Sequence, residues 1–257
     1  TKSAFGFKIM TCHYTFSNIS NGQYEVTIDL QGWMCTEQRT TLQKNIYDLG
    51  QQDPFFQSIC SMYGSVLSYK SESLFPHDTN CDSKKKKVLI ILGNPATHSV
   101  ANGMFFFSMG KPGAEETHTF WKKLEKPGLI QKIRRSTLKE ESETRKEMII
   151  NGTLSNNYLF GFTTFYSFPT PVEGDFKDVA GLRCLLKPIM KQIHDMEYDR
   201  LNAYKSKFLF VKGALWVFHE RTSHRCAKKK FQDTFERWPA RGKGSSGENL
   251  KNILKAN

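Results

Sequence analysis

The chain of 257 residues is 39% apolar and 13% aromatic, which is enough to bury a hydrophobic core. It has no run of roughly 20 consecutive apolar residues, as a membrane-spanning helix needs, and residues 1–10 lack the pattern of a signal peptide. We therefore expect a soluble monomer without a membrane partner, cytoplasmic or, in a eukaryote, nuclear. The 37 Lys and Arg residues against 25 Asp and Glu residues give a net charge of +12, which indicates a polyanionic partner.

Residues 1–85 have the pattern of an N-terminal extension that contains a hairpin and helices. Residues 5–16 and 23–30 alternate between apolar and polar around Ser20-Asn21-Gly22, which predicts a β-hairpin. The predicted helices of this region are residues 40–49 and 54–67. Because no motif with an evident chemical role lies here, we expect the extension to pack on a core domain formed by residues 86–257.

Residues 86–257 alternate between short apolar runs and helical segments. The predicted strands are residues 88–92, 159–166 and 208–211, with a fourth, shorter candidate at 234–238. The predicted helices are residues 117–124, 179–198 and 248–255. This order predicts an α/β protein with a three-layer αβα fold around a central, mostly parallel four-stranded sheet. The densely charged residues 131–148 predict a solvent-facing helix or a partly mobile insertion.

The cysteines and glycines indicate which cofactors to expect. The six cysteines are widely spread, with no Cys-x-x-Cys pair and no Cys/His cluster at metal-ligand spacing. Neither Gly-x-Gly-x-x-Gly nor Gly-x-x-x-x-Gly-Lys-Ser/Thr follows a predicted strand, which disfavours an unrelated nucleotide-binding protein. We therefore expect no metal and no organic cofactor.

The most informative segment begins at Gly93 and reads GNPATHSVANGMFFF, followed by FWKKL at residues 120–124. It resembles the first motif of the uracil-DNA glycosylase superfamily, nearest the mismatch-specific and thymine-DNA glycosylase branch. The pattern there is Gly-x-Asn-Pro-Gly, a pair such as Ser-Ala, a glycine, an apolar run that ends in a stacking Phe, and Phe-Trp-Lys. The resemblance implies that Asn94 is the catalytic residue that positions a water and that Phe106 stacks on the base.

Two later segments extend the resemblance over residues 88–255. Residues 163–170 are similar to the second strand of that branch, which ends in a Pro-Thr pair, and residues 238–247 occupy the place of a loop that enters the minor groove. The chain departs from the pattern at Leu92, which replaces the leading glycine, and in an insertion between Phe107 and Phe120. Its last loop lacks a His-Pro-Ser or Asn-Pro-Ser core, so no intercalating residue is assigned.

The chemistry of N-glycosidic hydrolysis explains these residue types. The reaction passes through an oxocarbenium-like sugar, so an enzyme must place a water at the sugar carbon and stabilise charge on the departing base. The Asn94 carbonyl can orient a water but is no strong base, and a positioned base typically contributes ~10²–10⁴-fold, so we expect slow turnover. Flipping a base costs a few kcal/mol, and stacking on Phe106 would return ~1–3 kcal/mol of it. Core packing is the alternative role of Phe106.

The same motifs suggest further base-binding residues. Ala96 stands where uracil-selective members carry a Tyr that blocks groups at pyrimidine C5, which implies that 5-substituted pyrimidines are accepted. His98 is a candidate catalytic residue that contacts a phosphate or the base, with a surface or capping role as the alternative. Thr164 and Tyr166, together with Thr163, are candidates for reading the edge of the base, depending on strand register.

Basic residues concentrate near the C-terminus, where residues 221–243 contain eight Lys and Arg residues against two acidic ones. Basic groups neutralise phosphates, and glycines permit close approach to the backbone of DNA. The candidate DNA-binding residues are Ser99, Arg241, Lys243, Ser245 and Ser246. A flexible solvated linker is the alternative for residues 241–246.

These features predict a monofunctional DNA glycosylase that removes a damaged or modified, 5-substituted pyrimidine from double- or single-stranded DNA and leaves an abasic site. Two roles stay open: base-excision repair, and bacterial defence against phage DNA with hypermodified cytosine. We expect no strand cleavage, because no lysine has a recognisable Schiff-base position. The alternative from another class is a non-catalytic nucleic-acid-binding relative of the glycosylases.

Overall fold

The computed structural model describes residues 14–20, 22–77, 84–108, 117–204, 207–212, 236–237 and 246–256. The chain forms two compact units whose segments interleave along the sequence. The first unit comprises Thr1–Ser73, Asn94–Phe105 and Thr164–Ala203, and the second comprises Leu74–Gly93, Phe106–Thr163 and Tyr204–Asn257. The sequence predicted two domains that are each continuous along the chain, residues 1–85 and 86–257. That division stays a prediction.

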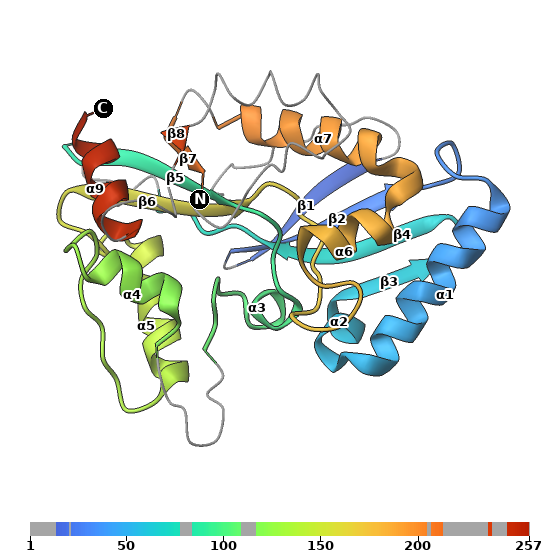
Figure 1. The fold of residues 1–257 in the computed structure, drawn as a ribbon, viewed down its shortest axis with the longest axis horizontal. Coiled ribbons are helices and arrows are strands. Elements are labelled where there is room, and N and C mark those ends of the chain that lie inside the picture. Colours follow the sequence, from blue (N-terminus) through green and yellow to red (C-terminus); the bar gives the residue numbers. More distant parts are fainter. Residues whose placement is uncertain are drawn as a thin grey trace. The chain divides into compact units, whose positions relative to one another are not determined.

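A four-stranded antiparallel sheet with the order β1-β2-β4-β3 lies in the first unit (Figure 1). Its strands are β1 (Tyr14–Ser20), β2 (Gln23–Asp29), β3 (Cys60–Tyr63) and β4 (Val66–Glu72). Within β2, Tyr24, Val26 and Ile28 are buried and alternate with more exposed residues, as in a sheet with one packed face. The predicted hairpin is confirmed for residues 14–29, and residues 5–13 lie outside the described ranges.

Residues 54–67 are not one helix, and here the prediction is wrong. Helix α1 (Thr36–Gln52) contains the predicted helical residues 40–49. Helix α2 (Pro54–Ile59) ends eight residues before the predicted end at residue 67. Strands β3 and β4 follow, joined by a turn in which Gly64 has a φ of +59°. Because a helix interior does not use this left-handed conformation, the chain reverses at Gly64 and pairs with itself.

The helical segment predicted at residues 179–198 is divided in two. Helix α6 (Asp178–Leu185) is followed by the short 3-10 helix η2 (Lys187–Ile189) and by α7 (Met190–Asn202). Pro188 explains the interruption, since proline has no amide hydrogen for an α-helical bond and its ring clashes with the preceding turn. Helix α3 (Thr97–Asn102), which carries part of the motif, contacts α2 and β4.

The second sheet has the strand order β6-β5-β7-β8. Its strands are β5 (Lys86–Leu92), β6 (Tyr158–Thr164), β7 (Leu209–Lys212) and β8 (Glu236–Arg237), one in each of the four predicted strand segments. The pairings of β5 with β7 and of β7 with β8 are parallel. The mixed α/β class is therefore confirmed. The three-layer arrangement around a mostly parallel sheet stays a prediction.

Helix α5 (Leu138–Ile150) corrects the expectation for the charged segment 131–148. It does not present all of its charges to solvent, because its buried residues are Glu141, Ser142, Arg145 and Ile149. The other helices described in the second unit are α4 (Thr119–Glu125) and α9 (Ser246–Ala256), which contact each other. None of the helices in the described ranges has the length and apolar character needed to cross a membrane.

Candidate active site

The loop that contains Asn94 is joined to Thr170 by side-chain and backbone hydrogen bonds. Asn94 Nδ2 donates to Thr170 Oγ1 at 2.7 Å. On the backbone, Thr97 N donates to Thr170 O at 3.2 Å and Thr170 N donates to Pro95 O at 3.0 Å, so that Ala96 and Thr170 form a parallel bridge. Two segments singled out in the sequence, residues 93–107 and 163–170, thus meet at these residues.

The hydrogen bond to Thr170 determines which end of the Asn94 amide remains available. An amide nitrogen only donates, whereas the carbonyl oxygen only accepts. With Nδ2 directed at Thr170, the described residues provide no hydrogen bond to Oδ1, and the residue is half-buried. Asn94 Oδ1 can therefore accept a hydrogen bond from a water, as its predicted role requires.

Ala96, His98 and Ser99 lie at the start of α3. Ala96 is the N-cap residue and is half-exposed, as is His98, whereas Ser99 is buried with Oγ 3.5 Å from His98 Nε2. Thr97 Oγ1 donates to Asp53 Oδ2 at 2.7 Å, and the other oxygen of Asp53 caps α2. A single carboxylate therefore connects the motif helix α3 to α2.

The candidates for reading the base edge, Thr164 and Tyr166, are both buried. Tyr166 Oη forms a hydrogen bond of 3.1 Å with His194 Nδ1, and burial raises the pKa of the Tyr166 hydroxyl. Thr164 Oγ1 has no hydrogen-bond partner in the part of the chain that the structure describes. A buried polar atom without a partner costs about 1–3 kcal/mol, so a ligand or water that reaches Thr164 Oγ1 would be favoured.

The residues after β6 rest on a buried charged network that sequence reasoning missed. Glu197 on α7 is fully buried and accepts hydrogen bonds from Tyr14 Oη (3.1 Å) and from the amide (2.5 Å) and hydroxyl of Ser167. Arg200 Nε donates to the other carboxylate oxygen at 2.6 Å. Tyr69 Oη lies 2.8 Å from Ser167 Oγ and 3.1 Å from Tyr14 Oη. Side chains of β1, β4 and α7 thus converge on Ser167.

Arg200 also fixes the end of β6 directly. Its Nη2 donates to the carbonyl oxygen of Thr164 and, at 3.1 Å, to that of Phe165. Glu197 thus orients Arg200, and Arg200 in turn binds the backbone of Thr164 and Phe165. In the sequence, Glu197 and Arg200 have the spacing of an ordinary surface ion pair on a helix, so no signal identified them.

This network predicts loss of stability at alkaline pH. Burial, and next the negative charge of Glu197, raises the pKa of Tyr14 and of Tyr69 well above the usual value. Because a tyrosine in the unfolded chain titrates near pH ~10, the stability that each contributes is complete below that pH and is lost as pH rises towards the folded pKa. Denaturation by urea from pH 8 to 11 should show this loss. The loss of stability between pH 8 and 11 should be smaller in Tyr69→Phe than in the wild type. An equal loss in both would show that ionisation of Tyr69 is not its cause.

Phe106 lies in the second unit and differs from the phenylalanines beside it. Phe105 and Phe107 are 2% and 8% exposed and belong to the core, whereas Phe106 is only half-buried. Phe106 has a φ of +51°, in the left-handed region that a bulky side chain rarely adopts. Such a conformation costs about 1–3 kcal/mol and is found most often at functional sites. The core-packing alternative therefore fits its two neighbours better than it fits Phe106.

The ring of Phe106 is stacked between two other rings. Its centroid lies 4.2 Å from that of Phe120 and 4.6 Å from that of His118, with interplanar angles of 26° and 21°. Two rings at these distances cannot share one face of a third without overlapping, so Phe120 and His118 cover opposite faces. Both faces of Phe106 are therefore occupied by rings of this chain.

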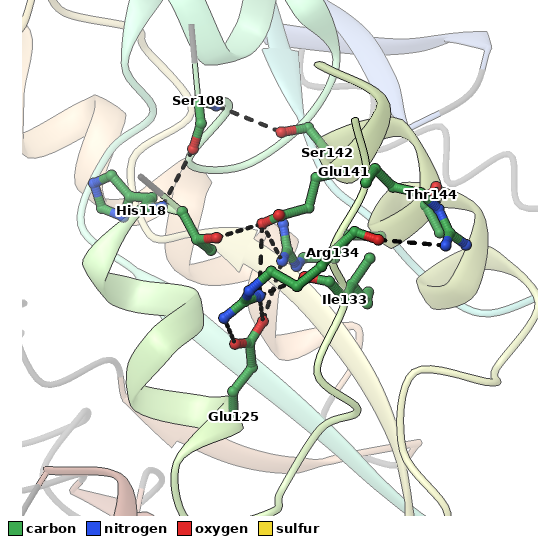
Figure 2. A network of polar contacts seen from close by, with 11 residues as sticks. Ser108, His118, Glu125, Ile133, Arg134, Glu141, Ser142 and Thr144 are labelled. Atoms are coloured by element: carbon green, nitrogen blue, oxygen red, sulfur yellow. Dashed lines mark hydrogen bonds and ion pairs between the residues drawn. The ribbon is translucent and has the colours of Figure 1, made fainter. Parts of the chain in front are cut away.

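Polar contacts around α4 and α5 hold the backbone of His118 in place (Figure 2). The His118 amide donates to Ser108 Oγ at 3.3 Å, and the Ser108 amide lies 3.5 Å from Ser142 Oγ on α5. Thr117 Oγ1 donates to Glu141 Oε1 at 2.6 Å. Thr117 is thus bonded directly to α5, and His118 is connected to α5 through Ser108.

The charged residues buried on α5 complete this network. Arg145 is 1% exposed and donates to Glu141 at 3.0 Å and to Glu125 at 3.2 Å, and its guanidinium lies 4.9 Å from the ring centre of Trp121. Arg134 closes the cluster with a bond of 2.9 Å to Glu125 (Figure 2). These contacts fix Trp121, whose ring packs at an edge against Phe120. Phe120 is therefore a rigid support for Phe106.

The predicted DNA-binding residues near the C-terminus are mostly outside the described ranges. Arg241, Lys243 and Ser245 lie outside them, as does the basic segment 221–235. Ser246 is the first residue of α9, and its side chain is not among those described. Gly247 packs so closely on α4 that a Cβ there would lie 1.9 Å from Lys123 O. The contacts proposed for Arg241, Lys243, Ser245 and Ser246 stay predictions.

Within the ranges that the structure describes, no three His, Cys, Asp or Glu side chains gather in a way that could hold a metal ion. Comparison of the chain with protein-family models, curated proteins and solved structures finds no match. A functional proposal therefore depends on the geometry of the residues themselves and on the motif that contains Asn94.

Proposed function

We propose that the protein is a divergent, monofunctional DNA glycosylase of the uracil-DNA glycosylase superfamily, which removes a flipped-out, 5-substituted pyrimidine and leaves an abasic site. The observation that carries the proposal is the 2.7 Å hydrogen bond from Asn94 Nδ2 to Thr170 Oγ1. It connects two segments that resemble the family, and it leaves Asn94 Oδ1 available to a water. In this proposal β5 to β8 form the central, mostly parallel sheet of a three-layer αβα fold.

The proposed reaction is hydrolysis with a water oriented by Asn94. The water oxygen bonds to the sugar C1′ while the glycosidic bond breaks, and the electron pair of that bond leaves with the base. The water gives its proton to solvent, and the departing base is protonated from solvent. Because the amide orients the water without deprotonating it, catalysis comes from placement of the reactants. Thr170 acts as a positioning residue that holds the amide in one orientation.

The proposed base site uses Phe106 as a stacking surface. Its half-buried side chain, its strained backbone and the rigid Phe120 behind it support this role. The methyl side chain of Ala96 leaves room for a group at pyrimidine C5. Thr164 Oγ1, a buried hydroxyl without a partner in the described ranges, is a candidate for bonding to the base edge, as is Tyr166 two residues further along.

DNA is the proposed partner because of the net charge of +12 and the basic segment 221–243. Neutralising phosphates with Lys and Arg supplies most of the sequence-independent affinity for DNA and makes it dependent on salt. The proposed contacts are Arg241, Lys243, Ser245 and Ser246, with Ser99 and His98 at the motif loop. Whether the activity serves repair or defence depends on which base is released.

A panel of duplexes tests the proposed function directly. The duplexes carry uracil, thymine opposite guanine, 5-hydroxymethylcytosine or glucosylated cytosine at one position, and alkali cleaves the strand wherever an abasic site has formed. We expect release of at least one 5-substituted base, with no strand cleavage before alkali. Failure to release any base, together with binding of the same duplexes, would favour the alternative function.

That alternative is a non-catalytic nucleic-acid-binding relative, and one observation favours it. Both faces of Phe106 are covered by His118 and Phe120, so a base has no open face on which to stack unless a ring moves. Phe120 is 4% exposed and is packed against Trp121, so it is held in place. His118 is exposed, so its ring can move off Phe106. A base can stack there only if it does, and the behaviour of His118 therefore decides between the two functions.

A further inference from the structure

The two rings that cover Phe106 are held very differently. Phe120 is 4% exposed and packs edge-on against Trp121 and Phe162, both fully buried. His118 is exposed, and in Figure 2 its imidazole lies on the side away from the carboxylates of Glu125 and Glu141. One face of Phe106 is thus covered by the buried ring of Phe120, and the other is covered by the imidazole of His118 at the protein surface.

His118 holds its position through a hydrogen bond that other residues form more commonly. It is the N-cap of α4, and its Nδ1 accepts from the amide of Phe120 at 3.1 Å. Ser, Thr, Asp and Asn are the usual N-cap residues, and none of them has a ring. Histidine at this position therefore adds a second effect to capping, the placement of an imidazole on Phe106 at a stacking distance of 4.6 Å.

We propose that the imidazole of His118 is an internal substitute for the flipped base, which covers the stacking face of Phe106 until a nucleobase displaces it. This inference rests on the proposed function for the identity of the ligand, a pyrimidine in DNA, but it does not depend on hydrolysis. An imidazole and a pyrimidine are both flat nitrogen heterocycles, so each can stack on the same face of Phe106. His118 thereby sets how tightly a base is held.

Replacing His118 by asparagine separates stacking from capping. The Asn side chain can accept the hydrogen bond from the Phe120 amide, so α4 keeps its N-cap while Phe106 loses the covering ring. The probe is a duplex with one thymine opposite guanine, and its control has a tetrahydrofuran abasic analogue in place of that thymine. Both are measured by fluorescence anisotropy with Asn94→Ala in the background, so that no substrate is consumed.

We expect His118→Asn to bind the thymine duplex about 2- to 10-fold more tightly, the range that corresponds to loss of one competing aromatic contact. Affinity for the abasic control should be unchanged. His118→Ala, which also loses the cap, should show the same difference between the two duplexes. Unchanged or weaker binding of the thymine duplex by His118→Asn would overturn the proposal.

The position of the His118 ring can also be followed directly by NMR of protein with labelled histidines. Stacked on Phe106, its ring protons should be shifted upfield, and Phe106→Leu should remove that shift. Binding of the thymine duplex should also remove it, whereas the abasic control should leave it in place. Retention of the shift in the thymine complex would show that His118 is not displaced.

These results are independent of base release. If a panel duplex loses its base while the His118 shift persists, the proposed function stands and this inference fails. If no base is released but the shift disappears with the thymine duplex, the inference stands and the glycosylase activity fails.

Discussion

Asn94→Ala should lower the rate of base release by at least about 10²-fold, because a water that is no longer held at the sugar carbon reacts from many unproductive positions. DNA binding should be unchanged, since the half-buried side chain carries no charge. Single-turnover measurement of abasic sites, at saturating enzyme, separates the chemical step from binding. An unchanged rate would remove Asn94 from the mechanism.

Thr170 provides matched controls for this prediction. Thr170→Val keeps the shape but leaves Asn94 Nδ2 without its acceptor, so the amide can rotate, and we expect about a 10-fold loss in the single-turnover rate. Thr170→Ser keeps the hydroxyl and should retain most activity. Asn94→Asp supplies a carboxylate that can act as a base and should raise the rate, by up to ~10²–10⁴-fold. If Thr170→Ser and Thr170→Val lower the single-turnover rate equally, the hydroxyl is not the positioning group.

Glu197→Leu should reduce the free energy of unfolding by about 3–5 kcal/mol, because it leaves the buried guanidinium of Arg200 without its carboxylate. Urea denaturation followed by circular dichroism measures the change. If this variant does not fold, Glu197→Gln keeps a hydrogen-bond acceptor and should show a smaller loss. A double variant, Glu197→Leu with Arg200→Met, should recover part of the lost stability, because it removes the unpaired buried charge but leaves the Ser167 amide without its acceptor.

The same helix contains a matched control for the charge pair. Lys191 and Asp195 on α7 also form an ion pair, at 3.2 Å, but their side chains are 74% and 55% exposed. Asp195→Ala should therefore cost less than about 1 kcal/mol. If Asp195→Ala and Glu197→Leu have equal effects, burial does not decide the strength of the pair, and the network around Ser167 is not what stabilises the first unit.

The local patterns of the sequence predicted most elements of regular structure. The apolar run in β5 and the alternation in β2 identify strands because each reflects burial of that strand alone. The strand pair after α2 was missed because β3 is four residues long, too short for a periodic signal. The burial of Arg145 was missed because its partner Glu125 lies on another helix, and charged residues are ordinarily exposed.

The candidate site was predictable only in its parts. The motif identified Asn94 and Phe106, but Thr170 was only the last residue of the second segment and had no predicted role. The hydrogen bond that joins Asn94 to Thr170 spans 76 residues of sequence. Nothing in three consecutive phenylalanines indicates that only Phe106 has a positive φ, or that His118 stacks on it. These features depend on tertiary contacts, which residue spacing alone does not encode.

The contacts of α3 with the N-terminal sheet and with α2 bear on how such a protein can evolve. Thr97 bonds to Asp53, and the backbone oxygen of Val100 accepts a hydrogen bond from the side chain of Gln23. The helix that follows Asn94 therefore has polar partners in residues that carry no motif. A recombination point between residue 53 and residue 97 would therefore separate two residues that bond to each other, Asp53 and Thr97.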